Sequence, residues 1–561
     1  MKVFFWLCCL PGCLVRAHAS NCLDDAPEVD LGYARYKGIS NCTSSINSFY
    51  GIRYAKPPIH SLRWQKPIAI DSEPWSANKS VTDVTEAGPR CIAIDPPPWV
   101  QGTVASNNTL PDESEDCLLL NVLVPKRPTS SRLPVLVNIH GGGYVSGTAP
   151  AGDAFVHQAQ GEVIFVAIQY RLGVFGFLAG EAIQASGAAN AGLLDQRAAL
   201  EWVRRNIHHF GGDPDKVTIM GGSAGGGSVT MQMMLHGGTE ASPPFRAAIP
   251  EYAWWAPIYN QTWVEKQYRR VLEESGCADL ICLRRAPTGA LNAAAWRAWS
   301  TALGASETIY GLFYFGPAID GDSILGLPAD EFRAGNFSAV PVLVDRDMHE
   351  GPYFTPLTVY TEEDLLTALK ALWQTVPDST INSILELYPP SVYNSSLVAS
   401  TEWFDALAPG FSASAAWVQM QAIFGASIVD CPSTTIVQSV VDAGQRAWKM
   451  VFEAGIQLHG ATMPYLWSED IDFSGTSTLG NTIFPGNATL ARALRDYVAS
   501  FVIHLDPNVL NSTTQQQFWP EFSNESRQIL HMKDNRIGTA YDFDSTEQCA
   551  LLSGLNTFQK S

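Results

Sequence analysis

Continuous apolar runs alternate with an amphipathic segment through the middle of the chain. Residues 133–139 (LPVLVNI), 163–168 (VIFVAI) and 217–220 (VTIM) form near-continuous apolar or β-branched runs, which are typical of strands buried on both faces of a mostly parallel sheet. Between the second and third runs, apolar residues recur at helical spacing over 193–207 and predict an amphipathic helix. This strand–helix–strand order implies a right-handed crossover, so we expect an α/β fold.

Further elements are predicted on both sides of this segment. Two strands and a helix are expected at 117–125 (CLLLNVLVP), 341–344 (PVLV) and 487–501. Short strand-like pieces ended by prolines, followed by a loop, are expected at 48–58, 62–67 and 93–116. The sequence has no internal repeat, low-complexity linker or charge block that would divide it, so we expect one large domain over residues 20–561 with long insertions.

The first 19 residues have the pattern of a secretory signal peptide. Lys2 precedes an apolar run over residues 3–14, and the small-x-small triplet AHA at 17–19 resembles a cleavage site. The run is too short to span a bilayer, and no later uninterrupted apolar run reaches the length of a membrane span. We therefore expect a soluble, exported product that makes no integral membrane contact.

Charge, cysteines and sequons agree with export. The formal net charge is −19, which disfavours nucleic acid and anionic membranes as partners. Eight of the eleven cysteines lie outside the signal, and an even number in an exported chain favours disulfides. Glycosylation of several N-x-S/T sequons is also expected, and these begin at Asn41, Asn78, Asn107, Asn260, Asn336, Asn394, Asn487, Asn511 and Asn524.

A glycine-rich pentapeptide follows the predicted strand at 217–220 directly. Residues 221–225 (GGSAG) match G-x-S-x-G, the strand-to-helix turn that exposes a nucleophilic serine, here Ser223. A serine held on so sharp a turn needs neighbours with almost no side chain, and the turn directs the following backbone N–H groups toward the reaction site. Ordinary glycine-rich turns have the same composition, so the pentapeptide alone leaves both interpretations open.

A second glycine cluster, HGGGY at 140–144, follows the run at 133–139. Acyl transfer develops negative charge on a carbonyl oxygen, and preorganised backbone N–H donors stabilise that charge by about 3–4 kcal/mol each. Gly142, Gly143 and Ala224 are the candidate donors of such an oxyanion hole. A phosphate-binding glycine loop is the alternative, but the Lys-Ser/Thr ending of a P-loop and a dinucleotide fingerprint are both absent from the sequence.

Taken together, HGGGY, GGSAGG (221–226) and EDCLLLNV (115–122) resemble the type-B carboxylesterases, a family of α/β-hydrolases that includes cholinesterases and fungal lipases. Further matches follow in order, with a wording near 248–256 that looks fungal: GIRYAKPP at 51–58, LRW at 62–64, YRLGVFGFL at 170–178, NAGLLDQRAALEWVRRNI at 190–207 and FGGDP at 210–214. The resemblance implies an α/β-hydrolase fold, with a large, mostly parallel central sheet, helices on both faces and long insertions.

The resemblance also implies a catalytic triad in the order Ser, acid, His, and neither a metal nor an organic cofactor. Ser223 is the expected nucleophile. Glu350 closes a strand-end motif at 340–351 and is the expected acid, while His459 lies in a His-Gly motif at 458–465 and is the expected general base. Asp345 and Asp347 are competing acids that match the family pattern less well.

Family resemblance further implies disulfides Cys91–Cys117 and Cys277–Cys282, and a buried structural ion pair between Arg63 and Glu115. The remaining cysteines are left to pair among themselves, and one such arrangement is Cys22–Cys42 with Cys431–Cys549.

Two departures from the family pattern stand near the expected site. Gly222 replaces a glutamate common at the residue before the serine, and Thr462 stands near the position of an acid common after the histidine. Neither position belongs to the triad, so we expect activity with an altered substrate preference. Candidate residues of the substrate pocket are Tyr144, Gly222, Trp254 and Trp255, although aromatic side chains at such places are about as often core.

The sequence thus predicts a secreted serine carboxylic ester hydrolase that acts on a small-molecule or lipid ester. A lipase or sterol esterase would share every catalytic residue, and so would an enzyme that tailors one secondary metabolite by hydrolysis or acyl transfer. A catalytically inactive, cholinesterase-like binding protein is disfavoured because all three triad candidates are present. The sequence does not indicate an oligomeric state.

Overall fold

The computed structural model describes most of the chain. The described residues are 26–41, 44–71, 80–93, 112–240, 242–255, 258–373, 375–397, 411–468, 487–544 and 546–554. The expected signal peptide, Cys22, Cys42 and the sequons at Asn78 and Asn107 lie outside these ranges.

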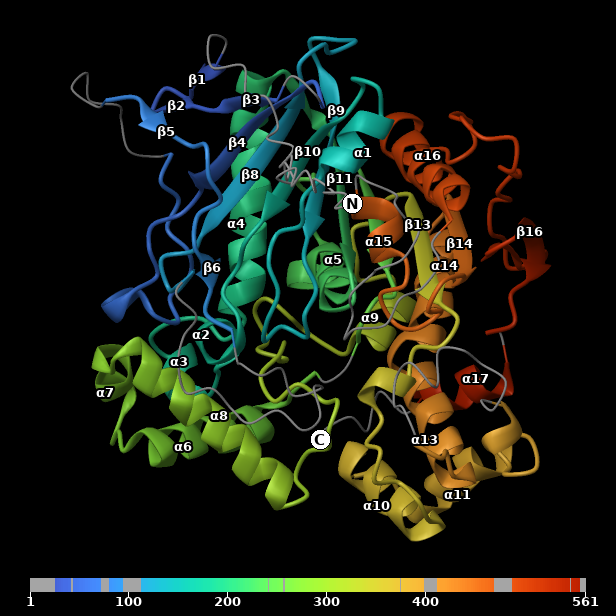
Figure 1. Ribbon diagram of the computed structural model, residues 1–561. Coiled ribbons are helices and arrows are strands. Elements are labelled where there is room, and N and C mark those ends of the chain that lie inside the picture. Colours follow the sequence, from blue (N-terminus) through green and yellow to red (C-terminus); the bar gives the residue numbers. More distant parts are fainter. Residues whose placement is uncertain are drawn as a thin grey trace, which may run out of the picture.

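An eleven-stranded mixed sheet forms the centre of the described structure (Figure 1). Its spatial order is β16 (Arg536–Tyr541), β15 (Gln528–Lys533), β14 (Ala447–Glu453), β13 (Val342–Asp347), β12 (Ala247–Glu251), β11 (Gly212–Gly222), β9 (Leu133–Ile139), β10 (Ile164–Ile168), β8 (Leu119–Pro125), β4 (Ile46–Arg53) and β3 (Ile39–Asn41). Neighbouring strands from β10 through β15 are parallel, while both edges of the sheet are antiparallel. The predicted large, mostly parallel sheet is therefore confirmed.

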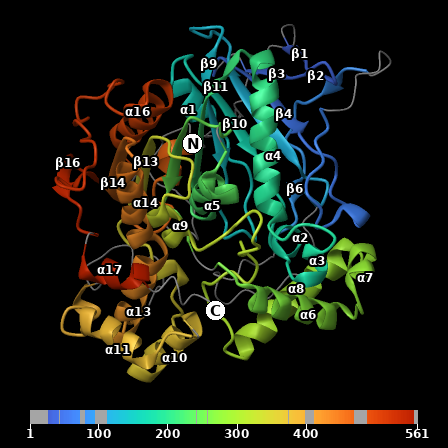
Figure 2. The same ribbon diagram turned by 180° about the vertical axis from the view of Figure 1, so that it is seen from behind.

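Helices cover both faces of this sheet. On the face toward the viewer of Figure 1 lie α1 (Asp153–Gln158), α15 (Met463–Trp467) and α16 (Ala488–His504), and on the opposite face, seen in Figure 2, lie α4 (Ala191–Asn206) and α5 (Ala224–Met234). Helix α14 (Cys431–Asp442) packs on β13 and β14. Every side chain of β9 and β10 is buried, because helices cover both faces of the sheet. The nearly continuous apolar sequence of these two strands fits this environment.

Long insertions gather beyond the carboxyl ends of the parallel strands, at the bottom of Figure 1. After β12 come α6 (Gln261–Ser275), α7 (Leu280–Arg285), α8 (Thr288–Gly304) and α9 (Pro328–Ala334). After β13 come α10 (Glu362–Leu372), α11 (Asp378–Leu387) and α13 (Ala415–Gly425). Remaining elements are α2 (Gly173–Phe177), α3 (Glu181–Gln184) and α17 (Glu547–Gly554), with two small sheets built from β1 (Glu28–Asp30), β2 (Arg35–Lys37), β5 (Thr82–Asp83), β6 (Arg90–Cys91) and β7 (Glu113–Ser114).

The predicted elements differ in how well they match. The runs at 133–139, 163–168 and 217–220 lie in β9, β10 and β11, and the amphipathic segment is α4. The expected strand at 62–67 is wrong, because a 3-10 turn over His60–Leu62 and Trp64 at φ 56° bend the chain there. Strand β12 was not predicted, since Pro250 lies inside it.

Three disulfides join described residues: Cys91–Cys117, Cys277–Cys282 and Cys431–Cys549. The Arg63 guanidinium binds both carboxylate oxygens of Glu115, at 2.7 and 2.6 Å, and both side chains are buried. Arg63 also donates to carbonyl oxygens of Leu283 and Ala286, so the pair ties the N-terminal segment to α7.

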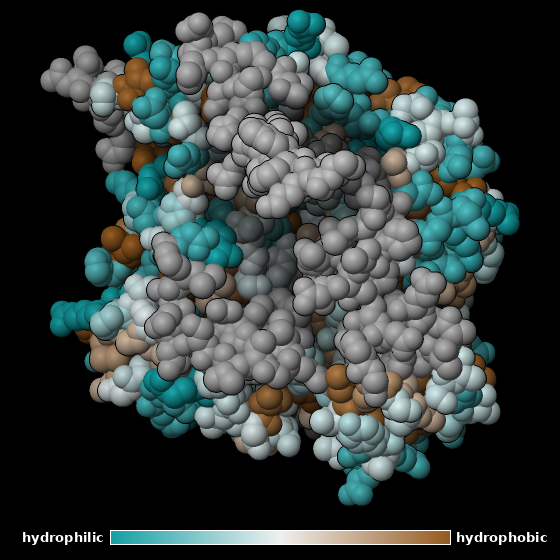
Figure 3. Space-filling view, viewed as in Figure 1, coloured by the Kyte–Doolittle hydropathy of each residue, from teal (hydrophilic) through white to brown (hydrophobic). Residues whose placement is uncertain are grey.

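On the face seen in Figure 3, hydrophilic side chains dominate the right-hand side, and hydrophobic ones occur in scattered patches. The most exposed large apolar side chains, Phe518, Ile281 and Tyr360, belong to separate segments. Within the described ranges no helix is long and apolar enough to cross a membrane.

Candidate active site

Ser223 occupies the sharp turn between β11 and α5. Its backbone angles, φ 60° and ψ −127°, lie outside the regions that ordinary residues favour, as a nucleophile elbow requires. The flanking glycines are sterically necessary, because a Cβ atom at Gly221 or Gly225 would lie 2.5 or 2.1 Å from the Ile139 carbonyl oxygen. The Ser223 N–H donates to the Glu251 carbonyl oxygen at 3.2 Å, so β9 and β12 hold the turn from both sides.

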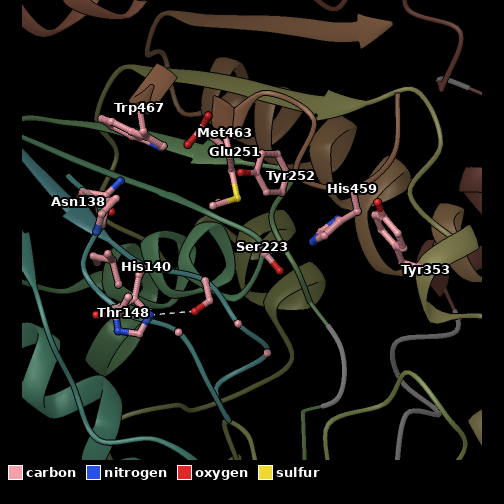
Figure 4. Close-up of a pocket in the computed structure, with 18 of the residues that line it drawn as sticks. Asn138, His140, Thr148, Ser223, Glu251, Tyr252, Tyr353, His459, Met463 and Trp467 are labelled. Carbon is pink, nitrogen blue, oxygen red and sulfur yellow. Dashed lines mark hydrogen bonds between the residues drawn. The ribbon is translucent and has the colours of Figure 1, made fainter. Parts of the chain in front are cut away.

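His459 lies in the loop after β14, and its Nδ1 atom is hydrogen-bonded to Glu350 Oε2. Oε1 of the same carboxylate accepts the Asp347 backbone N–H at 2.7 Å, so Glu350 is fixed at both oxygens. Nε2 of His459 has no hydrogen-bond partner among the described residues and lies at the end of the ring that points toward Ser223 in Figure 4. Imidazole and serine hydroxyl therefore face the same space.

The two competing acids have different roles. Asp347 Oδ2 accepts the backbone N–H groups of Gly460 and Ala461, at 2.7 and 3.1 Å, and thereby shapes the histidine loop. Asp345 accepts the Tyr252 backbone N–H through its carbonyl oxygen at 2.8 Å and its Oδ1 atom at 3.3 Å. Among these three acids, only Glu350 has a hydrogen bond to the imidazole.

Burial dominates the electrostatics of the His459–Glu350 pair. The His459 side chain is 8% exposed, and burial lowers its pKa to about 3. Burial also raises the pKa of the Glu350 carboxyl, with a further contribution from the negative charge of Asp430. Rings of Tyr252, Trp254 and Phe354 pack edge-on against the imidazole, with centroids 5.0, 5.5 and 4.9 Å away, and exclude water from it.

The glycine loop after β9 packs directly on the serine turn. A Cβ atom at Gly141 would lie 2.6 Å from the Gly222 carbonyl oxygen and 3.1 Å from Ser223 Cβ. Gly142 and Gly143 adopt φ values of 106° and 65°, and a Cβ at Gly143 would overlap the Phe313 ring at 2.2 Å. Only glycine fits at these positions. The backbone of the glycine loop therefore lies close to Ser223, as does the N-terminus of α5, which begins at Ala224.

A cavity of about 390 Å³ opens above Ser223 and His459 (Figure 4). Its lining includes Asn138, His140, Gly141, Gly142, Gly143, Thr148, Gly222, Ser223, Glu251, Tyr252, Phe313, Tyr353, Phe354, His459, Met463 and Trp467. Burial lowers the pKa of His140 to about 4, and its ring is held by the Gly141 carbonyl oxygen at 2.8 Å and by stacking on Tyr170.

Of the four predicted pocket residues, Gly222 lines this cavity and the other three lie behind its wall. Tyr144 is buried against Phe177. Trp254 packs on the aromatic rings around His459, and the Trp255 indole N–H turns away to donate to Thr230 Oγ1 at 2.9 Å. The Trp254 backbone N–H donates to the Ser223 carbonyl oxygen, so the segment 252–255 lies against the start of α5. In this position both indoles face the core.

Sequence reasoning missed several lining residues, chiefly Asn138, Glu251 and Tyr252. All three stand at the carboxyl ends of parallel strands or directly after them, where α/β folds place their ligands. For Asn138, the polar end of a buried apolar run was a signal present in the sequence. Among the described residues, no group of three or more His, Cys, Asp and Glu side chains has an arrangement that could hold a metal ion.

Comparison with known proteins assigns the family. A sequence model of the Carboxylesterase family matches residues 25–552. Carboxylesterase patB of Aspergillus clavatus is 35% identical over 441 residues, covering 69% of this chain and 76% of that protein. Secreted lipase 1 of Botryotinia fuckeliana is 30% identical over 574 residues, covering 92% of each chain. The crystal structure of Aspergillus niger EstA matches with a TM-score of 0.80 and 28% identity, over 96% of this chain and 99% of that one.

The chain therefore belongs to the carboxylesterase family, whose members at this similarity are esterases and lipases. The predicted family, fold and general activity, a carboxylic ester hydrolase, are confirmed.

Proposed function

We propose that the protein is a secreted serine carboxylic ester hydrolase in which Ser223, His459 and Glu350 form the catalytic triad. The observation that supports this most strongly is that one cavity contains the strained serine turn, the free edge of a carboxylate-bound imidazole and a glycine loop packed on the serine turn. Ester hydrolysis needs these groups together, because the nucleophile, the base and the oxyanion donors act on one carbonyl group.

In the first half-reaction, Ser223 Oγ attacks the ester carbonyl carbon and gives its proton to His459 Nε2. Burial lowers the pKa of His459, so the imidazole is neutral before the reaction and Nε2 carries the lone pair that accepts this proton. Glu350 keeps the other ring proton on Nδ1 and stabilises the imidazolium that forms. The backbone N–H groups of Gly142, Gly143 and Ala224 are assigned to the developing oxyanion.

The imidazolium then gives its proton to the leaving oxygen, the carbon–oxygen bond breaks and the alcohol departs, which ends the first half-reaction. The acyl group remains on Ser223. Water then attacks the acyl carbon with His459 as base, and the acid is released while the proton returns to Ser223. No other reactant is needed for this cycle.

Secretion and glycosylation belong to the same proposal. The disulfides fit an oxidising compartment, and one similar protein is named a secreted lipase. Two of the nine sequon asparagines, Asn336 and Asn511, are exposed in the described structure, and these are the sites we expect to be glycosylated first. A mass decrease of the exported protein on N-glycosidase treatment tests this.

A lipase or sterol esterase is the second candidate. The similarity to a protein named as a lipase favours it, and so does the aromatic side of the cavity around Phe313 and Phe354. Rates on p-nitrophenyl esters of increasing chain length, with and without an oil–water interface, separate the two. An esterase loses rate with long chains and gains none at the interface.

Ser223→Ala is the direct test of the triad. We expect kcat for p-nitrophenyl esters to fall on the order of 10⁶-fold with the thermal transition preserved. The matched control is Ser228→Ala, a buried serine five residues along in α5 that does not line the cavity and should retain hydrolysis. An organophosphate adduct located by mass on any residue other than Ser223, or full activity in Ser223→Ala, would contradict the proposal.

A further inference from the structure

The cavity has two chemically different walls on either side of Ser223. Figure 4 shows Asn138, Glu251, Met463 and Trp467 on one side, with Tyr353 and His459 on the other. The second wall is aromatic, since Phe313 and Phe354 also line the cavity and Phe354 packs against the imidazole. The first wall, which we name the sheet wall, carries a carboxamide and a carboxyl group.

Strand register explains why these two polar side chains share the sheet wall. Asn138 of β9 lies opposite Met220 of β11, and Glu251 of β12 lies opposite Gly222 of β11. Met220 and Gly222 are two residues apart and project to the same face of the sheet, so Asn138 and Glu251 do also. Helix α15 covers this face and supplies Met463 and Trp467 as the apolar roof of the sheet wall.

Both polar side chains are buried and keep hydrogen-bonding capacity that the described part of the protein does not use up. Asn138 is 4% exposed and Glu251 is 3% exposed, and buried polar groups of this kind normally have hydrogen-bond partners. Within the described ranges, the Asn138 carboxamide makes no side-chain hydrogen bond and no cation contacts the Glu251 carboxyl. The carboxyls of Asp345 and Asp347 are its charged neighbours, and the Thr462 side chain is its hydrogen-bonding neighbour.

The state of Glu251 determines what it can bind. Burial and the negative charges of Asp345 and Asp347 raise its pKa well above the ordinary value, which favours the neutral, protonated form of the carboxyl. A neutral carboxylic acid is both a donor and an acceptor, as is the Asn138 carboxamide. The complementary ligand group is therefore uncharged and itself able to donate or accept, such as a hydroxyl or a carbonyl.

Because Gly222, the residue before the serine, has no side chain, the polar surface of the sheet wall extends toward the nucleophile. A Cβ atom at Gly222 would lie 2.1 Å from the Tyr252 hydroxyl oxygen, so the phenol occupies the space that a side chain at position 222 would need. Tyr252 lines the cavity and packs its ring on His459. Polar groups of the sheet wall thus continue from Asn138 to the immediate neighbourhood of Ser223.

We propose that the polar side chains Asn138 and Glu251 of the sheet wall, together with Tyr252 beside them, recognise an uncharged hydrogen-bonding substituent, a hydroxyl or carbonyl group, that the substrate carries near its ester group. This inference rests on the proposed function, since it names the substrate class of the same site. The aromatic wall then holds the hydrocarbon part of the ester.

Matched substrate pairs test the proposal. One pair is p-nitrophenyl butyrate and p-nitrophenyl 3-hydroxybutyrate, which differ by a hydroxyl on the acyl part. The other is butyl acetate and 3-hydroxybutyl acetate, which differ on the alcohol part. We expect kcat/KM to favour the hydroxylated ester by about tenfold or more in one of the pairs, and that pair identifies which half of the substrate meets the sheet wall.

Variants assign this preference to the sheet wall. Glu251→Leu should reduce the preference to about one, while Glu251→Gln, which keeps a donor and an acceptor, should retain most of it. Ser228→Ala is the control: this buried serine of α5 accepts a hydrogen bond from the Gln196 side chain and does not line the cavity, so the preference should stay at the wild-type value.

Three outcomes would overturn the proposal: no preference in either pair, an equal preference in Glu251→Leu and wild type, or a preference for a trimethylammonium-substituted ester over the hydroxylated one. Failure of the proposed function looks different, because Ser223→Ala would then hydrolyse every substrate of the panel.

Discussion

Strand β13 carries two buried acids on one face and a buried arginine on the other. The two faces differ in whether the buried carboxylates are paired with cations. Toward the cavity, Asp345 and Asp347 lie beside Glu251 and Glu350. Toward the other face, the Arg346 guanidinium binds Asp544 through Nε at 2.7 Å and Nη2 at 2.5 Å.

Lys449 completes the charge-compensated side. Its ammonium group is fully buried and binds Asp542 Oδ1 at 2.8 Å, Asp544 Oδ2 at 2.7 Å and Thr434 Oγ1 at 2.6 Å. The two cations lower the pKa of Asp544 to about 2, against the effect of burial. This network pairs buried groups of opposite charge and serves the structure.

The acids near the cavity have no comparable cation, and burial, with the charge of Glu350, raises the pKa of Asp345 to about 8. There, burial favours the protonated form of Asp345 in place of pairing with a cation. The comparison shows that this fold leaves buried charge without cations where ligands bind and compensates it elsewhere, because a group already paired with a cation cannot respond to a substrate.

The largest expected effect is on catalysis. Glu350→Gln should lower kcat about 10⁴-fold, because the amide cannot stabilise the imidazolium or hold the useful tautomer of His459. Asp347→Asn is the matched comparison, since its amide oxygen can still accept the N–H groups of Gly460 and Ala461, and it should lose less than about tenfold. Steady-state rates on p-nitrophenyl butyrate decide, and equal losses in the two variants would remove the distinction between the acids.

The next effect is on stability. Lys449→Met should lower the free energy of unfolding by about 3–5 kcal/mol, because it leaves Asp542 and Asp544 short of a buried cation. Lys266→Met removes an exposed ion pair with Glu307, of 2.9 Å, and should cost about 1 kcal/mol or less. Urea denaturation of both variants measures this, and similar losses would show that burial of the pair is unimportant.

The smallest effect is on the pH dependence of stability. A carboxyl whose folded-state pKa is raised contributes stability that is fully present below its unfolded pKa of about 4 and lost as pH rises through the folded value, which for Asp345 is about 8. Wild-type protein should therefore lose stability between pH 5 and 8. Asp345→Asn should reduce that slope by up to about 1.4 kcal/mol per pH unit. Urea midpoints at several pH values test this, and parallel curves would contradict it.

Local motifs allowed much of the framework to be predicted. The runs that became β9, β10 and β11 are apolar or β-branched at nearly every position, so burial on both faces follows from composition. The elements that were missed, such as β12, are short or interrupted by proline, and only their neighbours in the sheet make them strands. Propensity over a few residues does not contain that information.

By itself, the sequence determined the turn at Ser223, the glycine loop before it and the motifs around Glu350 and His459, because each depends on residues adjacent in the chain. Only the tertiary structure decided that Glu350, rather than Asp345 or Asp347, reaches the imidazole. It also decided that Trp254 and Trp255 face the core while Asn138, Glu251 and Tyr252 line the cavity. These outcomes depend on the register of parallel strands from distant segments, and that register is fixed by packing of the whole sheet.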